Sequence, residues 1–180
     1  MDFLDFENHD LYFDEPLSTE DTAMLDLAAE SYPEPETEEI LLKLHNRLND
    51  NLTIIVALYR FYYYQHRYQD TLDIAEKALK VSAVKLRLRV DWTELTEDHL
   101  GMGVFVSMGL IRFYMLGLKA SAYVLMRMER IEEAHARLKK IVELDPADQF
   151  GSSFLLKIAE RRLSTEHARQ HNVESVCNRI

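Results

Sequence analysis

The chain has 180 residues, 47% of them hydrophobic, with five glycines and four prolines, so it can bury one core and contains few helix breakers. Its single cysteine excludes an internal disulfide, its apolar runs are too short to span a bilayer, and its net charge of −10 argues against nucleic-acid binding. The acidic start lacks the basic residues and apolar stretch of a signal peptide, so we expect a cytoplasmic protein.

The first 36 residues are assigned to an acidic amino-terminal arm. Residues 1–42 contain 14 Asp or Glu and no Lys or Arg, which leaves 17 acidic and 21 basic residues in the rest of the chain. Acidic residues alternate with Phe3, Phe6 and Phe13, a composition typical of a flexible segment with apolar anchors. Ser18 and Asp21 predict a short capped helix that ends before the proline pair at 33 and 35, where we place the domain boundary.

The residues that follow predict a helical domain over positions 37–163. Thr37 can cap a helix that runs to Arg47, and the polar residues 49–51 end that helix before the next apolar segment. Residues 84–91 alternate basic and apolar side chains with the period of a strand. An isolated strand would have no partner in a helical protein, so the alternative is an irregular connection or part of a helix.

Residues 100–111 form the longest uncharged apolar run, which predicts a buried helix because it is too short to cross a membrane. Four of the five glycines lie in or just after this run, and their spacing does not fit a phosphate-binding loop. We expect close helix contact or a kink near Gly109. The apolar region from Gly101 to Leu118 is also a candidate homodimer surface.

The carboxyl end predicts one more helix and a tail. Asp145 and Pro146 are expected to start the helix, whose apolar face includes Phe150, Phe154 and Ile158. Such a helix would cap the last exposed face of the domain. Residues 164–180 are polar and are assigned to a tail.

Small and bulky residues recur with the spacing of two closely packed antiparallel helices. In residues 115–148 the packing positions of the two helices, with a proline after the second, are Leu118, Ala122, Leu125, Ala134, Leu138 and Pro146. A weaker copy over residues 52–85 has Ile55, Tyr59, Tyr62 and Ala78 as packing residues. The alanines let the helices approach, and the larger side chains fill the remaining space.

This pattern resembles the tetratricopeptide repeat (TPR) family, whose unit is about 34 residues long. The unit at residues 52–85 has Ala83 where the family usually has proline, and the unit at residues 115–148 lacks the family's aromatic residues. Ala78 and Ile141 are 63 residues apart, which is less than two whole repeats, so the interval between the units is expected to hold a modified hairpin. The resemblance implies an all-α fold of antiparallel helical hairpins in a short solenoid with a carboxy-terminal capping helix.

The resemblance also implies a concave groove, because the first helices of successive TPR units line such a groove and face the ligand. Carried over to this chain, the groove residues are Val56, Arg60, Tyr63, Tyr64, Lys119, Tyr123, Met126 and Arg127. This basic and aromatic set predicts an acidic, aromatic-bearing protein or peptide partner. The alternative is that the tyrosines pack against a neighbouring helix. The pattern with which some TPR proteins clamp a terminal carboxylate is absent.

The chain shows no motif for catalysis or cofactor binding, so we expect a protein that is not an enzyme. His167 and His171, with Cys177 nearby, could share a helix face, but no further ligand completes a zinc motif, so no metal site is predicted. The expected function is protein binding by an adaptor or secretion-type chaperone, without nucleic acid or membrane. The alternative is a regulator that acts through its acidic arm, either by autoinhibition or by binding a basic partner.

Overall fold

The computed structural model describes residues 16–177, with side-chain surroundings for residues 16–165. Within the described range the chain is all helical, as predicted, and contains no strand. The elements in that range are α1 (Thr19–Glu30), α2 (Pro35–Arg47), α3 (Leu52–Tyr64), α4 (Tyr68–Lys85), the 3-10 helix η1 (Trp92–Glu94), α5 (Glu97–Val106), α6 (Met108–Arg127), α7 (Ile131–Leu144) and α8 (Ser153–Cys177).

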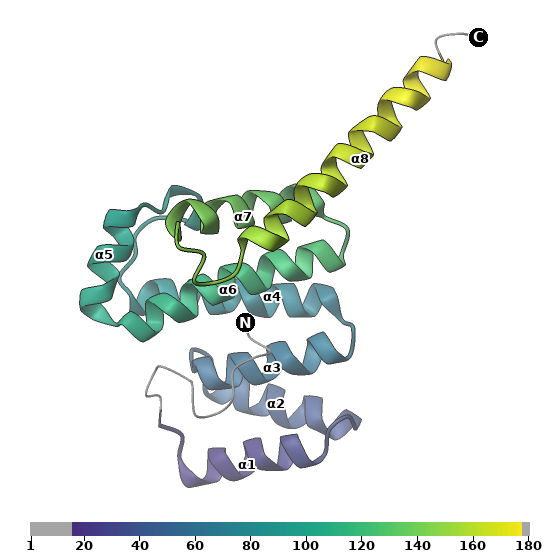
Figure 1. Ribbon diagram of the computed structural model, residues 1–180. Helices are drawn as coiled ribbons and strands as arrows, with labels where there is room; N and C mark the ends of the chain where they lie inside the picture. Colours follow the sequence, from purple (N-terminus) through teal and green to yellow (C-terminus); the bar gives the residue numbers. More distant parts are fainter. Residues whose placement is uncertain (1–15, 178–180) are drawn as a thin grey trace.

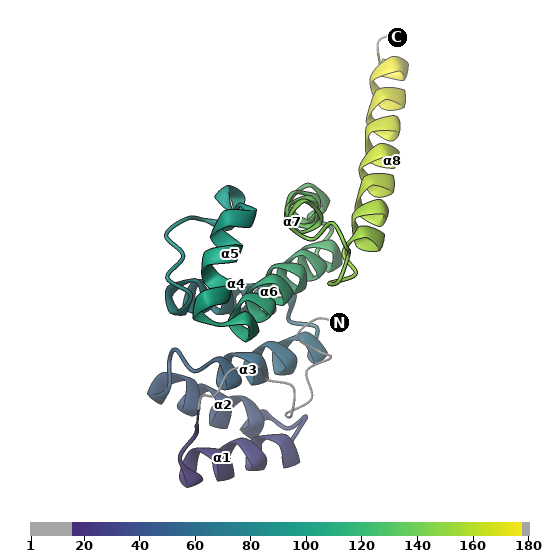
Figure 2. The same cartoon turned by 60° about the vertical axis from the view of Figure 1, so that its left-hand side comes forward.

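The helices pack as a stack of antiparallel hairpins (Figure 1). The hairpins α1–α2, α3–α4 and α6–α7 follow one another, with α2 against α3, α4 against α6 and α8 against α7. Helix α5 packs on α6 at the side of the stack, and Figure 2 shows α8 extending beyond α7. The α3–α4 hairpin therefore packs against a neighbouring hairpin on each side, as in a short solenoid.

The turns of two hairpins have the same backbone geometry. His66 and Glu129 both have φ of 58°, and they occupy the same place between α3 and α4 and between α6 and α7. In each turn the backbone N–H of the next residue donates a hydrogen bond to a carbonyl of the preceding helix. The N–O distance is 3.0 Å from Arg67 to Tyr62 and 2.9 Å from Arg130 to Leu125. This pattern satisfies carbonyls that the helix end leaves unpaired. The two turns are 63 residues apart, the same interval that separates the packing residues in the sequence.

The residues predicted to pack within the two hairpins lie in the core. Ala122 and Ala134 are fully buried where α6 and α7 meet, and small side chains there permit close approach. The other buried members of the predicted set are Ile55, Tyr59, Tyr62, Ala78, Leu118, Leu125 and Leu138. Pro146 is exposed and follows the end of α7.

A half-buried arginine links the two hairpins that resemble each other. Arg137 on α7 forms an ion pair with Glu76 on α4 at 2.5 Å and donates a hydrogen bond to the Ser121 hydroxyl on α6 at 2.6 Å. Its guanidinium also lies over the Trp92 ring of η1, 5.3 Å from the centroid. One side chain thus connects three helices and the segment that leaves α4.

The amino-terminal helix belongs to the stack. Ser18 caps α1 as predicted, accepting the Asp21 N–H at 3.1 Å, but α1 then packs on α2 and places Ala28 in a hydrophobic cluster with Leu41 and Phe61. The predicted boundary after residue 36 therefore falls inside a hairpin. Helix α2 also begins at Pro35 and not at a Thr37 cap, because proline suits the first helical position. Residues 1–15 of the predicted arm lie outside the described range.

Residues 84–91 follow the alternative to a strand, part of a helix and an irregular connection, whereas residues 100–111 differ from the expected buried helix. The first part completes α4, which ends in a turn with Arg87 at φ 59° and the Leu88 N–H bonded to the Ala83 carbonyl. The apolar run is then split at Ser107, which caps α6 through the Leu110 N–H. The prediction that this run is a buried helix was wrong, because only one side of α5 rests on α6.

The last helix begins later than predicted. Residues 145–152 form a loop in which two carboxylates accept backbone N–H groups: Asp145 from Phe150 at 2.9 Å and Asp148 from Ser152 at 2.7 Å. Asp148 and Gly151 have positive φ, which turns the chain before α8 starts at Ser153. Helix α8 continues to Cys177, through most of the segment assigned to a tail.

We predict that Ala134→Leu destabilises the protein by roughly 1–3 kcal/mol, because a larger side chain cannot fit where α7 meets α6. Urea unfolding followed by circular dichroism measures the change. Ala136→Leu is the matched control, since Ala136 is exposed on the same helix and should change stability little. Equal stability of the two variants would contradict the close contact.

Candidate functional site

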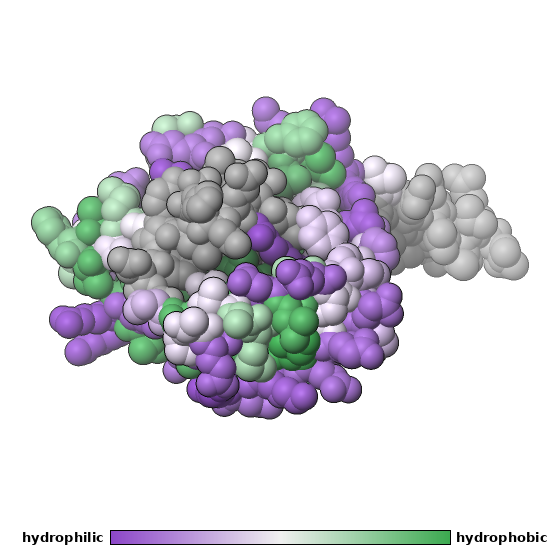
Figure 3. Space-filling view, turned by 90° about the horizontal axis from the view of Figure 1, so that it is seen from below, coloured by the Kyte–Doolittle hydropathy of each residue, from purple (hydrophilic) through white to green (hydrophobic). Residues whose placement is uncertain are grey.

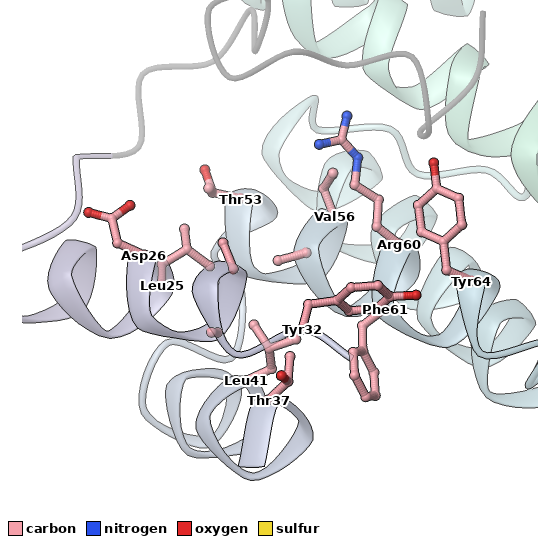
Figure 4. Close-up of a pocket in the computed structure, with 13 residues that line it drawn as sticks. Leu25, Asp26, Tyr32, Thr37, Leu41, Thr53, Val56, Arg60, Phe61 and Tyr64 are labelled. Atoms are coloured by element: carbon pink, nitrogen blue, oxygen red, sulfur yellow. The ribbon is translucent and has the colours of Figure 1, made fainter. Parts of the chain in front are cut away.

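A pocket of about 360 Å³ lies between α1, α2 and α3. Its lining is mostly apolar, with polar groups at the edge (Figure 4). The lining residues are Leu25, Asp26, Ala28, Ala29, Tyr32, Thr37, Leu41, Thr53, Val56, Ala57, Arg60, Phe61 and Tyr64. The volume is within the roughly 300–1,000 Å³ typical of ligand pockets.

Small residues on facing helices leave this space open. Ala28 and Ala29 line it from α1 and Ala57 lines it from α3, so these helices present methyl groups where longer side chains would fill the gap. Phe61 contacts the Tyr32 ring edge-on, with 6.2 Å between centroids, and both rings line the pocket. The pocket is therefore a consequence of residue size on α1 and α3.

The two ends of the pocket carry different charges. Figure 4 shows Asp26 and Thr53 at one end, with Arg60 and Tyr64 at the other and their polar atoms pointing in the same direction. Asp26 comes from α1, whereas Arg60 and Tyr64 come from α3. A bound segment can therefore place an acidic group near Arg60 while its apolar side chains contact the floor.

A buried hydroxyl lines the same pocket. The Thr37 Oγ is buried and has no hydrogen-bond partner among the residues that the structure describes. An unsatisfied buried hydroxyl costs roughly 1–3 kcal/mol, which a polar group of a ligand can offset. Thr37 therefore adds a polar position to an otherwise apolar floor.

Polar contacts next to the pocket hold α2 against α3. The Tyr62 hydroxyl donates to Glu38 at 3.2 Å, and Arg67 pairs with the other Glu38 oxygen at 2.7 Å. Burial and the neighbouring Glu38 carboxylate raise the pKa of Tyr62 to about 12. Tyr62 therefore remains protonated at neutral pH and keeps its hydrogen bond.

The structure divides the predicted groove residues into three groups. Val56, Arg60 and Tyr64 line the pocket. Tyr63 and Tyr123 instead meet at the junction of α3 and α6, with ring centroids 6.1 Å apart, and Arg127 donates a hydrogen bond to the Tyr68 hydroxyl at 2.8 Å. Lys119 and Met126 are buried in α6.

The junction of α3, α4 and α6 is an aromatic cluster. The Tyr63 ring stacks on Tyr59 at 6.2 Å and lies 6.1 Å from Tyr68. Burial, followed by a hydrogen bond with Tyr123, raises the pKa of the Tyr63 hydroxyl above its usual range. These contacts are those of packed tyrosines, which was the alternative to groove residues for Tyr63 and Tyr123.

Lys119 holds the loop before α8. Lys119 is only 7% exposed, and its Nζ donates a hydrogen bond to the Phe150 carbonyl at 2.6 Å. The spacing of the repeat places Lys119 on the helix face expected for a ligand, but the 145–152 loop packs over that position. The loop thus takes the place that a partner was predicted to occupy.

Most of the pocket comes from residues that the sequence analysis assigned to the arm or left without a role. Leu25, Ala28 and Tyr32 belong to the hairpin formed by α1 and α2. The sequence could have predicted this hairpin, because a capped helix after Ser18 is followed by a short turn and a second helix. Its acidic composition pointed to an arm instead.

The described part of the chain shows no group of three His, Cys, Asp or Glu side chains arranged to hold a metal ion. The side chains of His167, His171 and Cys177 lie outside the described surroundings. Among the described residues, no helix is both long enough and apolar enough to cross a membrane.

One curated protein is similar to the chain over most of its length. It is 42% identical over 158 residues, which cover 88% of each chain, and is described as "Uncharacterized 19.8 kDa protein in nifW 5'region" from Azotobacter chroococcum mcd 1. No family model and no solved structure matches the chain.

We predict that Lys119→Met destabilises the protein by roughly 1.5–3 kcal/mol, because the Phe150 carbonyl loses a charged hydrogen-bond donor. Denaturant unfolding measures the loss. Lys157→Met, at an exposed lysine of α8, is the control and should be nearly neutral. If both substitutions are neutral, the Lys119–Phe150 bond does not hold the loop.

Proposed function

The chain belongs to the same family as the Azotobacter chroococcum protein, and we propose that it is a TPR-like scaffold that binds a segment of a partner protein in the pocket between α1 and α3. The observation that supports this most directly is the position of the pocket. It lies between the first helices of two successive hairpins, where helical-repeat proteins form their concave binding surface.

The chemistry of the pocket suits an extended or helical peptide with apolar anchors. Leu25, Val56 and Phe61 offer apolar contact, and Arg60 beside Tyr64 offers a charge and a hydroxyl for an acidic group. Contacts to buried aliphatic and aromatic anchors supply most binding energy, whereas charge at the rim mainly sets orientation and association rate. We therefore infer an acidic, aromatic-bearing segment as the ligand and an adaptor or chaperone role in the cytoplasm.

The alternative function uses the acidic arm as the active element. Residues 1–15 combine acids with Phe3, Phe6 and Phe13, which is the ligand chemistry inferred for the pocket. A tethered segment has an effective concentration near millimolar when the linker is short and flexible, so a weak contact suffices for autoinhibition. Alternatively, the arm itself binds a basic partner.

We predict that Ala29→Trp abolishes partner capture, because an indole added to the pocket edge fills the space without disturbing the core. Affinity purification from the native host, with quantitative comparison of captured proteins, measures the effect. Ala23→Trp, exposed on the same helix and outside the pocket, should capture partners as the unchanged chain does. Equal capture by both variants would remove the pocket from the function.

A peptide of residues 1–15 separates the two functions. We expect it to bind a chain that lacks residues 1–15, and to bind the Arg60→Glu form of that chain on the order of tenfold or more weakly, as for a lost interfacial charge contact. Fluorescence anisotropy measures both affinities, with Arg89→Glu as an exposed-arginine control. If deletion of residues 1–15 abolishes partner capture, the arm is the recognition element. Stronger capture after deletion indicates autoinhibition.

A further inference from the structure

Helix α5 and the start of α6 expose a continuous apolar surface. The α5 patch consists of Met102, Val104, Phe105, Val106 and Met108, all of which are exposed. Phe105 is 92% exposed and Met102 is 61% exposed. Figure 3 shows hydrophobic surface at the left edge of the molecule, where Figure 1 places α5.

A close contact beneath α5 turns these side chains outward. Gly103 is the buried residue of α5, and a Cβ at this position would meet Ile111 Cδ1 at 2.4 Å. The helix therefore packs on α6 closely at a residue without a side chain. Leu100 is half-buried against the core, whereas the other large apolar side chains of α5 are exposed. A phenylalanine buries roughly 150–250 Å² when it enters a core, so Phe105 leaves much apolar area uncovered.

We propose that the α5 patch binds a second copy of this chain. In a two-fold contact the same surface faces itself, so charges near the axis meet like charges. The stretch 99–111 contains no Asp, Glu, Lys or Arg, although the whole chain has a net charge of −10. The patch is therefore a surface on which two acidic copies can meet without like charges in contact.

The patch also has complementary shape elements for an antiparallel pairing of two α5 helices. Gly101 lies one helical turn before Phe105 on the same face, and a Cβ built on Gly101 would meet nothing within 4 Å. In an antiparallel pair, Phe105 of each copy can lie over Gly101 of the other. Each contact then occurs twice, as two-fold symmetry requires.

A membrane surface fits the α5 patch less well. Interfacial helices carry Lys and Arg on their polar side, whereas α5 begins with Glu97 and Asp98.

The α5 patch is separate from the pocket. The patch is built from α5 and α6, whereas the pocket of the proposed function is built from α1, α2 and α3. The dimer consequently presents two pockets and can be tested independently of peptide binding.

Sedimentation equilibrium of the full chain tests the dimer. We expect a concentration-dependent dimer, and we expect Phe105→Asp to weaken it on the order of 100-fold or more, as for a central interface aromatic. Phe154→Asp is the matched control, because Phe154 is 70% exposed on α8 and lies outside the α5 patch. A wild-type monomer at every concentration, or equal weakening by the two variants, overturns the proposal.

Crosslinking provides a second measurement that does not depend on the folding of Phe105→Asp. In a Cys177→Ser background, Gly101→Cys should give a covalent dimer with a short bismaleimide, whereas Ser164→Cys, at an exposed site of α8, should not. Equal crosslinking of both cysteines overturns the pairing. Phe105-dependent binding of a monomer to phosphatidylserine vesicles also overturns it and assigns the patch to a lipid surface.

Discussion

A helical hairpin exposes apolar faces that another hairpin must cover, and this constraint determines the order of the whole chain. Its effect is clearest between α4 and α6, which pack together although residues 86–107 separate them in sequence. The Arg137 contacts with Glu76 and Ser121 lie at this junction and link α7 to α4 and α6. The pocket depends on the same constraint, because its walls are helices that are held by their own neighbours in the stack.

Local features of the fold were predictable because their signals are local. Alanines and bulky residues at helical spacing indicated which faces of α3, α4, α6 and α7 would be buried, and the 63-residue interval recurs in the two turns at His66 and Glu129. The surroundings of a face were less predictable. Lys119 has the register of a ligand-facing residue, but a loop 31 positions away along the chain covers it. Periodicity specifies a face and does not specify what folds over it.

Composition misled the prediction at two places for opposite reasons. The acids of α1 suggested an arm, although a few apolar residues such as Ala28 suffice to anchor a helix on a hairpin. The uncharged run at 100–111 suggested burial, although a glycine at position 103 provides the contact with α6 and leaves Phe105 in solvent. The candidate site was predictable only in its α3 half, where Val56, Arg60 and Tyr64 face the pocket. The half from α1 and α2 required the packing of the first hairpin.

The direct contact between α4 and α6 makes residues 86–107 an excursion from the stack. The chain leaves at Leu86 and returns at Met108, and the hairpins on either side are held together by their own contacts. Leu86 and Leu95 are buried in the core and tie the excursion to the stack. The length of its exposed part can change during evolution at little cost to the core, because lengthening a loop adds little closure entropy. Relatives that keep the same stack can therefore acquire different assembly surfaces. In this segment the surface can change within the family while the stacked hairpins still fold in the same way.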